Sequence, residues 1–175
     1  TEIEVINDKK QYLKVNYGGI KYIHVRASKY KNNGIMRIYH LLEFHFRLFF
    51  IANKFEKPDI IAQVSAIPFS NVIYYLAKRY KAKYIIDVVD LWPESFVAYG
   101  LISRTNPLLK LAYRAEYWLY KKADLIVFSM EGGKKYITEK GWDIASGGAI
   151  DLKKVHHINN GVDLADYNRN KDLYK

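Results

Sequence analysis

The sequence contains no cysteine, no run of five or more charges of one sign and no long uncharged apolar stretch. Without cysteine, disulfide frameworks, cysteine-ligated zinc or iron–sulfur sites and thiol nucleophiles are excluded. Without a like-charged run, neither a basic nucleic-acid arm nor a localisation signal is visible. No apolar segment reaches the length of a transmembrane helix, and the first residues lack the basic start and apolar core of a signal peptide.

The residues that are present favour a folded, basic and aromatic domain. Half of the 175 residues are hydrophobic and 26% are charged, which is typical of one packed domain that buries about 70% of its unfolded surface. Lys and Arg number 28 against 18 Asp and Glu, a net charge of +10 whose excess leans toward the first 60 residues, and there are 16 Tyr. This combination predicts an anionic partner that is flat or amphipathic: nucleic acid, a membrane surface, or a phosphorylated or sugar ligand.

From residue 59 onward, short apolar runs alternate with amphipathic segments. The runs predict strands at 59–64, 83–89, 124–128 and 154–158, and the segments predict helices at 71–80, 107–123 and from about 133 to Gly141. Such alternation predicts right-handed βαβ crossovers and a parallel sheet. The expected fold class is therefore α/β, a doubly wound, Rossmann-like parallel sheet.

The first third of the chain is less regular. Extended segments are expected at 2–6, 12–15 and 20–26, with a turn at 17–19, so they form either a hairpin or an edge of the sheet. The segment 35–55 predicts a helix with a narrow polar stripe on an apolar, aromatic cylinder. It has two interpretations, a buried helix or an interfacial one. In the interfacial case Phe44, Phe46, Phe49 and Phe50 enter the headgroup region while Arg37, Arg47 and Lys54 meet anionic lipid.

Ligands of open parallel sheets bind beyond the carboxyl ends of the strands, which selects the loops 65–70, 90–95, 129–133 and 159–163. The loop 90–95 (Asp-Leu-Trp-Pro-Glu-Ser) is the most informative of them. A carboxylate there can accept hydrogen bonds from sugar hydroxyls or act as a base, and the indole of Trp92 offers a stacking face. A purely structural interpretation stays open: Asp90 caps the following turn, Trp92 belongs to the core, and Glu94 is a solvated first-turn acid.

Two further patterns have alternative interpretations. Ser129 and Glu131 precede a helix whose free N–H groups could bind an anion, or Ser129 caps that helix and Glu131 favours its first turn. His156 and His157 are adjacent in a strand, so they point to opposite faces and cannot chelate one metal ion together. No metal site is predicted.

The loop 90–95, the strand 124–128 with its following helix, and the Asn-Gly-Val-Asp segment 160–163 together resemble the N-terminal half of family 4 glycosyltransferases. The similarity is to the bacterial branch that builds capsules and O-antigens and shares a D-x-W-P-E-S loop, and it covers residues 59–163. It implies one half-domain of the GT-B architecture, truncated at both ends. The family's first strand and glycine-rich loop are expected before Thr1, and its donor-binding domain after residue 162.

The resemblance also implies site residues and domain limits. Residues 1–163 are expected to form the acceptor-side domain and residues 164–175 the start of the interdomain linker. By this resemblance Asp90 is a catalytic residue, Trp92, Glu94 and Ser65 bind the acceptor, and Asn160 and Gly161 lie at the hinge, with Ser129 and Glu131 as further anion-binding or hinge candidates.

The expected function is that of a segment of a retaining, metal-independent glycosyltransferase, inactive alone. It moves a sugar from a nucleotide-sugar donor to a saccharide or polyprenyl-linked acceptor in cell-surface polysaccharide synthesis, at the cytoplasmic face of the membrane. The segment itself needs no cofactor, and the missing donor domain and an anionic membrane surface are its expected partners. The alternative is a basic membrane-surface or anionic-polymer binding module without chemistry. Nucleic acid is not an expected partner, because the basic residues are dispersed over several helices.

Overall fold

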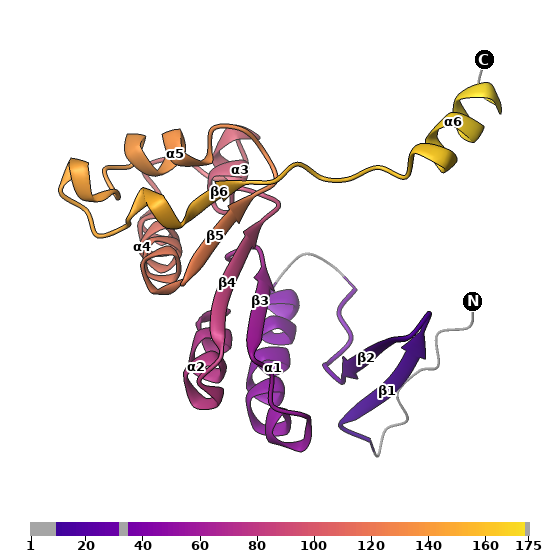
Figure 1. The fold of residues 1–175 in the computed structure, drawn as a ribbon. Helices are drawn as coiled ribbons and strands as arrows, with labels where there is room; N and C mark the ends of the chain where they lie inside the picture. Colours follow the sequence, from indigo (N-terminus) through magenta and orange to yellow (C-terminus); the bar gives the residue numbers. More distant parts are fainter. Residues whose placement is uncertain (1–9, 32–34, 174–175) are drawn as a thin grey trace.

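The computed structural model describes residues 10–31 and 35–173. Its centre is a four-stranded, all-parallel sheet in the order β3-β4-β5-β6. The strands are β3 (Ile60–Val64), β4 (Lys83–Val88), β5 (Leu125–Phe128) and β6 (Val155–His157). Helices flank the sheet (Figure 1), so the predicted α/β class with a Rossmann-like parallel sheet is confirmed.

Each crossover between neighbouring strands contains at least one helix. These are α2 (Asn71–Tyr80) before β4, α3 (Glu94–Ala98) and α4 (Pro107–Lys122) before β5, and α5 (Gly133–Glu139) before β6. Short 3-10 turns at Ile144–Ser146 and Leu152–Lys154 complete the last crossover. The Asn106 side chain accepts the N–H of Leu108 at 2.9 Å with Pro107 behind it, the N-cap that the sequence predicts.

The core lies between the sheet and its helices. Alternate strand residues point into it and are fully buried, among them Ile86, Ile126 and Phe128. α5 approaches the sheet closely, because a Cβ at Gly133 would lie 2.3 Å from the Phe128 ring. At the edge strand β3, in contrast, Ile60 and Val64 remain exposed.

The first two described strands form a separate antiparallel hairpin, β1 (Tyr12–Tyr17) with β2 (Ile20–Val25). Gly18 and Gly19 both adopt positive φ in the two-residue turn, a conformation that glycine adopts without strain. The hairpin interpretation is therefore confirmed, and the alternative of an edge of the main sheet is wrong for these strands. The extended segment expected at 2–6 lies outside the described residues.

The aromatic helix is α1 (Ile35–Ile51), followed by a 3-10 turn, η1 (Ala52–Lys54). One side of α1 buries His45 and Ile51, whereas another side exposes apolar residues that include Phe46 and Phe50. Neither interpretation of this helix holds for all of its faces. Phe44, expected in lipid by one of them, instead lines an apolar pocket between α1, β3 and α2.

The predicted polar stripe of α1 faces the chain that follows the hairpin. Glu43 accepts the N–H of Ser28 at 2.7 Å and pairs with Arg47 at 2.7 Å, and the Nδ1 of His40 lies 2.6 Å from the carbonyl oxygen of Ser28. Hydrogen bonds from Ser28, together with Arg47, lower the pKa of Glu43 to about 2. Arg47 is therefore engaged within the protein, and its role as a lipid contact stays a prediction.

After β6 the chain runs through an extended segment to α6 (Leu164–Leu173), which projects away from the rest of the molecule (Figure 1). Residues 164–173 of the expected linker are thus helical and, through residue 171, exposed. Among the described residues, no helix combines the length and apolarity needed to cross a membrane.

Candidate site at the carboxyl edge of the sheet

The parallel pairing brings the four candidate loops to one edge of the sheet. Backbone hydrogen bonds show this. The N–H of Ser65 donates to the carbonyl oxygen of Asp87 at 2.7 Å, that of Ser129 to the carbonyl oxygen of Val88 at 3.2 Å, and that of Ile158 to the carbonyl oxygen of Phe128 at 3.0 Å. Each of these three loops therefore leaves its strand beside the last residues of a neighbouring strand. The sequence prediction that these loops share an edge is confirmed by the register.

Asp90 is exposed and lies two residues after the end of β4. Its backbone oxygen accepts the N–H of Trp92 at 3.0 Å, and no hydrogen bond or ion pair joins its carboxylate to a residue within the described ranges. The N-cap of α3 is Pro93, without a side-chain cap, so the interpretation of Asp90 as a cap is wrong. Its carboxylate is left available to accept hydrogen bonds from a ligand.

The rest of this loop is held in place by packing. Trp92 is half-buried and meets Phe96 edge-on, with ring centroids 5.9 Å apart, so it lies outside the fully buried core. The Trp92–Pro93 peptide bond is cis, and Pro93 is buried. The Phe96 contact therefore positions the indole, and part of the indole stays accessible to solvent.

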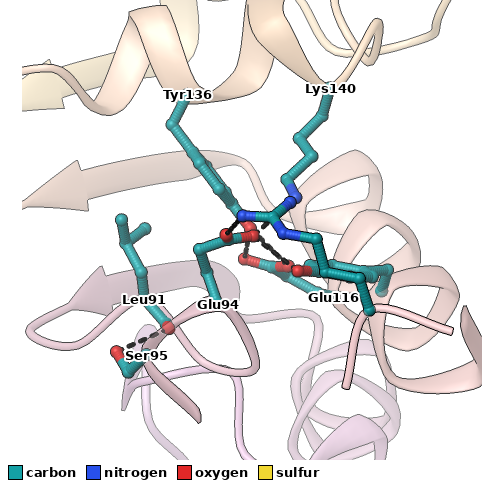
Figure 2. A network of polar contacts seen from close by, with 8 residues as sticks. Leu91, Glu94, Ser95, Glu116, Tyr136 and Lys140 are labelled. Carbon is teal, nitrogen blue, oxygen red and sulfur yellow. Dashed lines mark hydrogen bonds and ion pairs between the residues drawn. The ribbon is translucent and has the colours of Figure 1, made fainter. Parts of the chain in front are cut away.

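Glu94, the first residue of α3, is the most heavily bonded residue of the loop (Figure 2). Its carboxylate accepts hydrogen bonds from the Lys140 Nζ at 2.6 Å, from the Tyr113 hydroxyl, and from Arg104 at 3.2 Å. Lys140 also lies 3.9 Å from the centroid of the Tyr113 ring, within cation–π range. Glu94 thus links α3 to the helices α4 and α5, and it is not the solvated acid of the structural interpretation.

Two opposing effects set the charge of Glu94. Burial alone would raise the pKa of its carboxyl, but the hydrogen bonds from Lys140 and Tyr113 and the positive charges of Lys140 and Arg104 outweigh burial and lower it. Glu94 is therefore ionised at neutral pH. Three side chains of the same chain already occupy most of its acceptor positions, so little of this carboxylate is left for a sugar hydroxyl.

A second carboxyl group near the Glu94 contacts belongs to Glu116 of α4, which is fully buried. The Tyr136 hydroxyl lies 3.0 and 3.2 Å from its two oxygens, and Figure 2 shows Tyr136 and Lys140 reaching from α5 toward the two glutamates. Burial raises the pKa of Glu116 to about 8, because a buried carboxylate loses its hydration. At neutral pH Glu116 is therefore mostly protonated, and Glu94 carries the negative charge.

Sequence reasoning missed the partners of Glu94 and the whole Glu116 pair. One signal was present: Glu116 follows Leu109 by seven residues and precedes Leu119 and Tyr120 by three and four, which places an acid on the apolar face of its helix. Nothing in the sequence indicated that Lys140, at the end of α5, reaches Glu94 across 46 residues.

The remaining candidates have mixed positions. Ser129 turns its hydroxyl toward the carbonyl oxygens of Val88 and Val89, at 3.3 and 3.4 Å, and α5 begins only at Gly133 with Gly132 as its N-cap. The interpretation of Ser129 as a helix cap is therefore wrong, and Glu131 is exposed ahead of the helix.

Ser65 is buried at positive φ, and its carbonyl oxygen accepts the side chain of Gln63 at 2.8 Å. Little of the Ser65 side chain is accessible to a ligand, and its role in acceptor binding stays a prediction. Asn160 and Gly161 are exposed in the extended segment between β6 and α6, where a hinge role also stays a prediction.

An apolar cavity of about 480 Å³ lies apart from Asp90, between α1, β3 and α2. His45 and Gln63 are polar residues of its lining, and burial lowers the pKa of His45, which keeps its imidazole neutral. Across the described ranges, no group of three or more His, Asp or Glu side chains is placed to hold a metal ion.

Comparison of the sequence with protein-family models and with curated proteins found no match to either.

Proposed function

We propose that the chain is the acceptor-side half of a retaining glycosyltransferase similar to the family 4 enzymes. It acts in bacterial cell-surface polysaccharide synthesis, peripherally at the cytoplasmic face of the membrane. A nucleotide sugar is the donor, bound by a partner domain, and a saccharide or polyprenyl-linked saccharide is the acceptor. The observation that carries the proposal is Asp90, an exposed and unpaired carboxylate beside Trp92 at the carboxyl end of β4, within the hexapeptide that the family shares.

The chemistry assigned to the loop follows from its contacts. Asp90 accepts a hydrogen bond from the attacking hydroxyl of the acceptor and holds its oxygen toward the donor. Trp92 offers a partly accessible indole face on which a sugar ring stacks. Glu94 is a positioning residue, since its bonds to Lys140, Tyr113 and Arg104 fix the start of α3 and so the loop before it.

The test compares two aspartates in the enzyme that carries this sequence. Asp90→Asn is expected to lower sugar transfer to a lipid-linked saccharide by about 100-fold or more, because the neutral amide accepts a weaker hydrogen bond than a carboxylate and cannot take the proton of the reacting hydroxyl. Asp59→Asn is the matched control, since Asp59 is also exposed but precedes β3 at the opposite edge of the sheet. Transfer by Asp90→Asn within a few-fold of the wild type, with unchanged circular dichroism, would contradict the proposal.

A second candidate function is a membrane-surface or anionic-polymer binding module without chemistry. The observation that favours it is the exposed apolar side of α1. In that case Asp90→Asn and Asp59→Asn behave alike in every assay, while surface binding persists in both.

A further inference from the structure

The side of α1 that faces away from the core is an uninterrupted apolar stripe. Its members begin at an adjacent pair, continue at spacings of three and four residues, and are all exposed: Ile38, Tyr39, Leu42, Phe46 and Phe50. Phe46 is 65% and Phe50 57% exposed, and their rings lie 4.7 Å apart, centroid to centroid. A helix that packs only on its own domain carries polar residues on this side.

The stripe is costly for a protein surrounded only by water. Full burial of one phenylalanine side chain stabilises a folded state by roughly 1.5–3 kcal/mol, and here two adjacent rings forgo most of that gain. Contiguous exposed apolar patches of this kind mark surfaces that meet a partner or a membrane. The partner's chemistry follows from the residues that surround the stripe.

The neighbouring helices extend this surface with aromatic and basic side chains. α1 packs against α2, and α2 against α4. Arg79 of α2 lies 5.0 Å from the Phe49 ring centroid and donates to the Phe49 carbonyl oxygen at 3.1 Å, so it borders the stripe directly. On α4, Trp118 lies against Tyr74 and Tyr75 of α2, and Lys122 lies over Trp118.

The charged residues of these three helices are mostly basic. Their basic residues are Arg37, Arg47, Lys78, Arg79, Lys110, Arg114, Lys121 and Lys122. Their only acids are Glu43, which binds Ser28 and Arg47, and Glu116, which is fully buried. Neither carboxylate faces outward, so the outer surface of the layer offers cations without competing anions.

We propose that the outer faces of α1, α2 and α4 form a docking surface for the anionic headgroups of a membrane. Phe46 and Phe50 enter the boundary between headgroups and acyl chains, while Lys78, Arg79 and Lys122 contact the lipid phosphates. This inference deepens the membrane part of the proposed function and rests on it. It assigns the proposed membrane association to one surface of the molecule, opposite the side of α1 that packs into the fold.

An apolar stripe distinguishes a membrane from a nucleic acid as the partner. Nucleic acid also attracts dispersed Lys and Arg, but its recognition uses aromatic faces for stacking and gives no role to Ile38 and Leu42. A lipid interface uses all members of the stripe, because it removes aliphatic and aromatic side chains from water together.

The test is co-sedimentation of the full chain with vesicles of phosphatidylcholine alone, or with an equal amount of phosphatidylglycerol. Binding is expected only to the anionic vesicles and is expected to weaken as salt is raised. The double variant Phe46→Ser/Phe50→Ser is expected to lower the binding constant by about 10-fold or more. Its matched control is Leu101→Ser/Ile144→Ser, which removes two apolar side chains of similar exposure outside the three helices.

A second pair of variants tests the charges. Lys78→Glu/Arg79→Glu is expected to abolish binding at moderate salt, whereas Lys134→Glu/Lys153→Glu, with the same change in net charge on exposed residues elsewhere, retains most of it. Equal losses in both pairs would show that net charge alone drives adsorption and would overturn the proposal.

The absence of cysteine allows a direct measurement of depth. A spin label at Phe46→Cys is expected to gain accessibility to oxygen when anionic vesicles are added, and one at Lys134→Cys is not. Tight binding of single-stranded RNA that Phe46→Ser/Phe50→Ser leaves unchanged, without vesicle binding, would also overturn the proposal. None of these measurements involves sugar transfer, so the docking surface and the transferase can fail independently.

Discussion

The two ends of the described fold use aromatic and apolar residues in opposite ways. In the sheet region (residues 59–158), Tyr84, Tyr120 and Phe128 are almost completely buried. In the hairpin–α1 region (residues 10–31 and 35–58), Tyr22, Phe46 and Phe50 are exposed. Composition alone does not distinguish these roles. The difference teaches that the hairpin–α1 region, unlike the sheet region, buries few of its apolar side chains and exposes many of them.

The largest expected effect separates two phenylalanines. Phe128→Ala, in the sheet region, is expected to lower the free energy of unfolding by about 3–5 kcal/mol, because it leaves a cavity among fully buried neighbours. Phe46→Ala, in α1, is expected to change it by less than about 0.5 kcal/mol. Urea unfolding followed by circular dichroism measures both, and similar losses for the two would erase the contrast between the regions.

Next in size is the pH dependence of two glutamates. The pKa of Glu116 is raised from 4.5 to about 8, so the stability that it contributes is complete below pH 4.5 and is lost as the pH rises through 8. The pKa of Glu43 is lowered from 4.5 to about 2, so its contribution is complete above pH 4.5 and is lost as the pH falls toward 2. The two regions therefore respond to pH with opposite signs.

The measurement compares urea unfolding of the wild type, Glu116→Gln and Glu43→Gln across this range. The stability of Glu116→Gln relative to the wild type should rise between pH 4.5 and 8, by an amount on the order of a few kcal/mol. The stability of Glu43→Gln relative to the wild type should rise as the pH falls from 4.5 to 2. A Glu116→Gln curve parallel to the wild-type curve above pH 4.5 would refute the protonated state of Glu116.

A smaller effect concerns the link between α3 and α5. Lys140→Met removes the 2.6 Å bond to Glu94 while it keeps an extended side chain, and we expect a loss of about 1–3 kcal/mol with a rise in the pKa of Glu94. Carboxyl NMR titration of Glu94 measures the rise. Lys135→Met is the control, because Lys135 pairs with Glu139 on the exposed side of α5, where such pairs contribute little.

The smallest expected effect is that of a helix cap. Asn106→Ala removes the acceptor for the Leu108 N–H and should cost about 1 kcal/mol, since the first turn of α4 loses its side-chain cap. Asn106→Asp preserves the acceptor oxygen and should retain most of the stability. Thermal unfolding distinguishes the two, and equal melting temperatures for all three proteins would remove the cap's contribution.

Local sequence predicted the sheet region well, because its signals are local. α2 begins and ends at the predicted residues, and the Asn106–Pro107 start of α4 follows from the preferences of single positions. The partners of Glu94 were beyond prediction, since Lys140 and Tyr113 reach it only through the way three helices meet. The exposed side of α1 was equally hidden, because periodicity identifies an apolar helix but not which of its faces the fold covers.

The edge strand β3 has a consequence for handling the protein. Among the described residues it pairs on one side only, with β4, and its five residues Ile-Ile-Ala-Gln-Val include neither a charge nor a proline. An uncharged apolar strand with unpaired backbone groups is a template for a strand of another molecule. Any self-association of the purified chain at high concentration is therefore expected to begin at β3, and a lysine in place of the exposed Ile60 or Val64 is expected to suppress it.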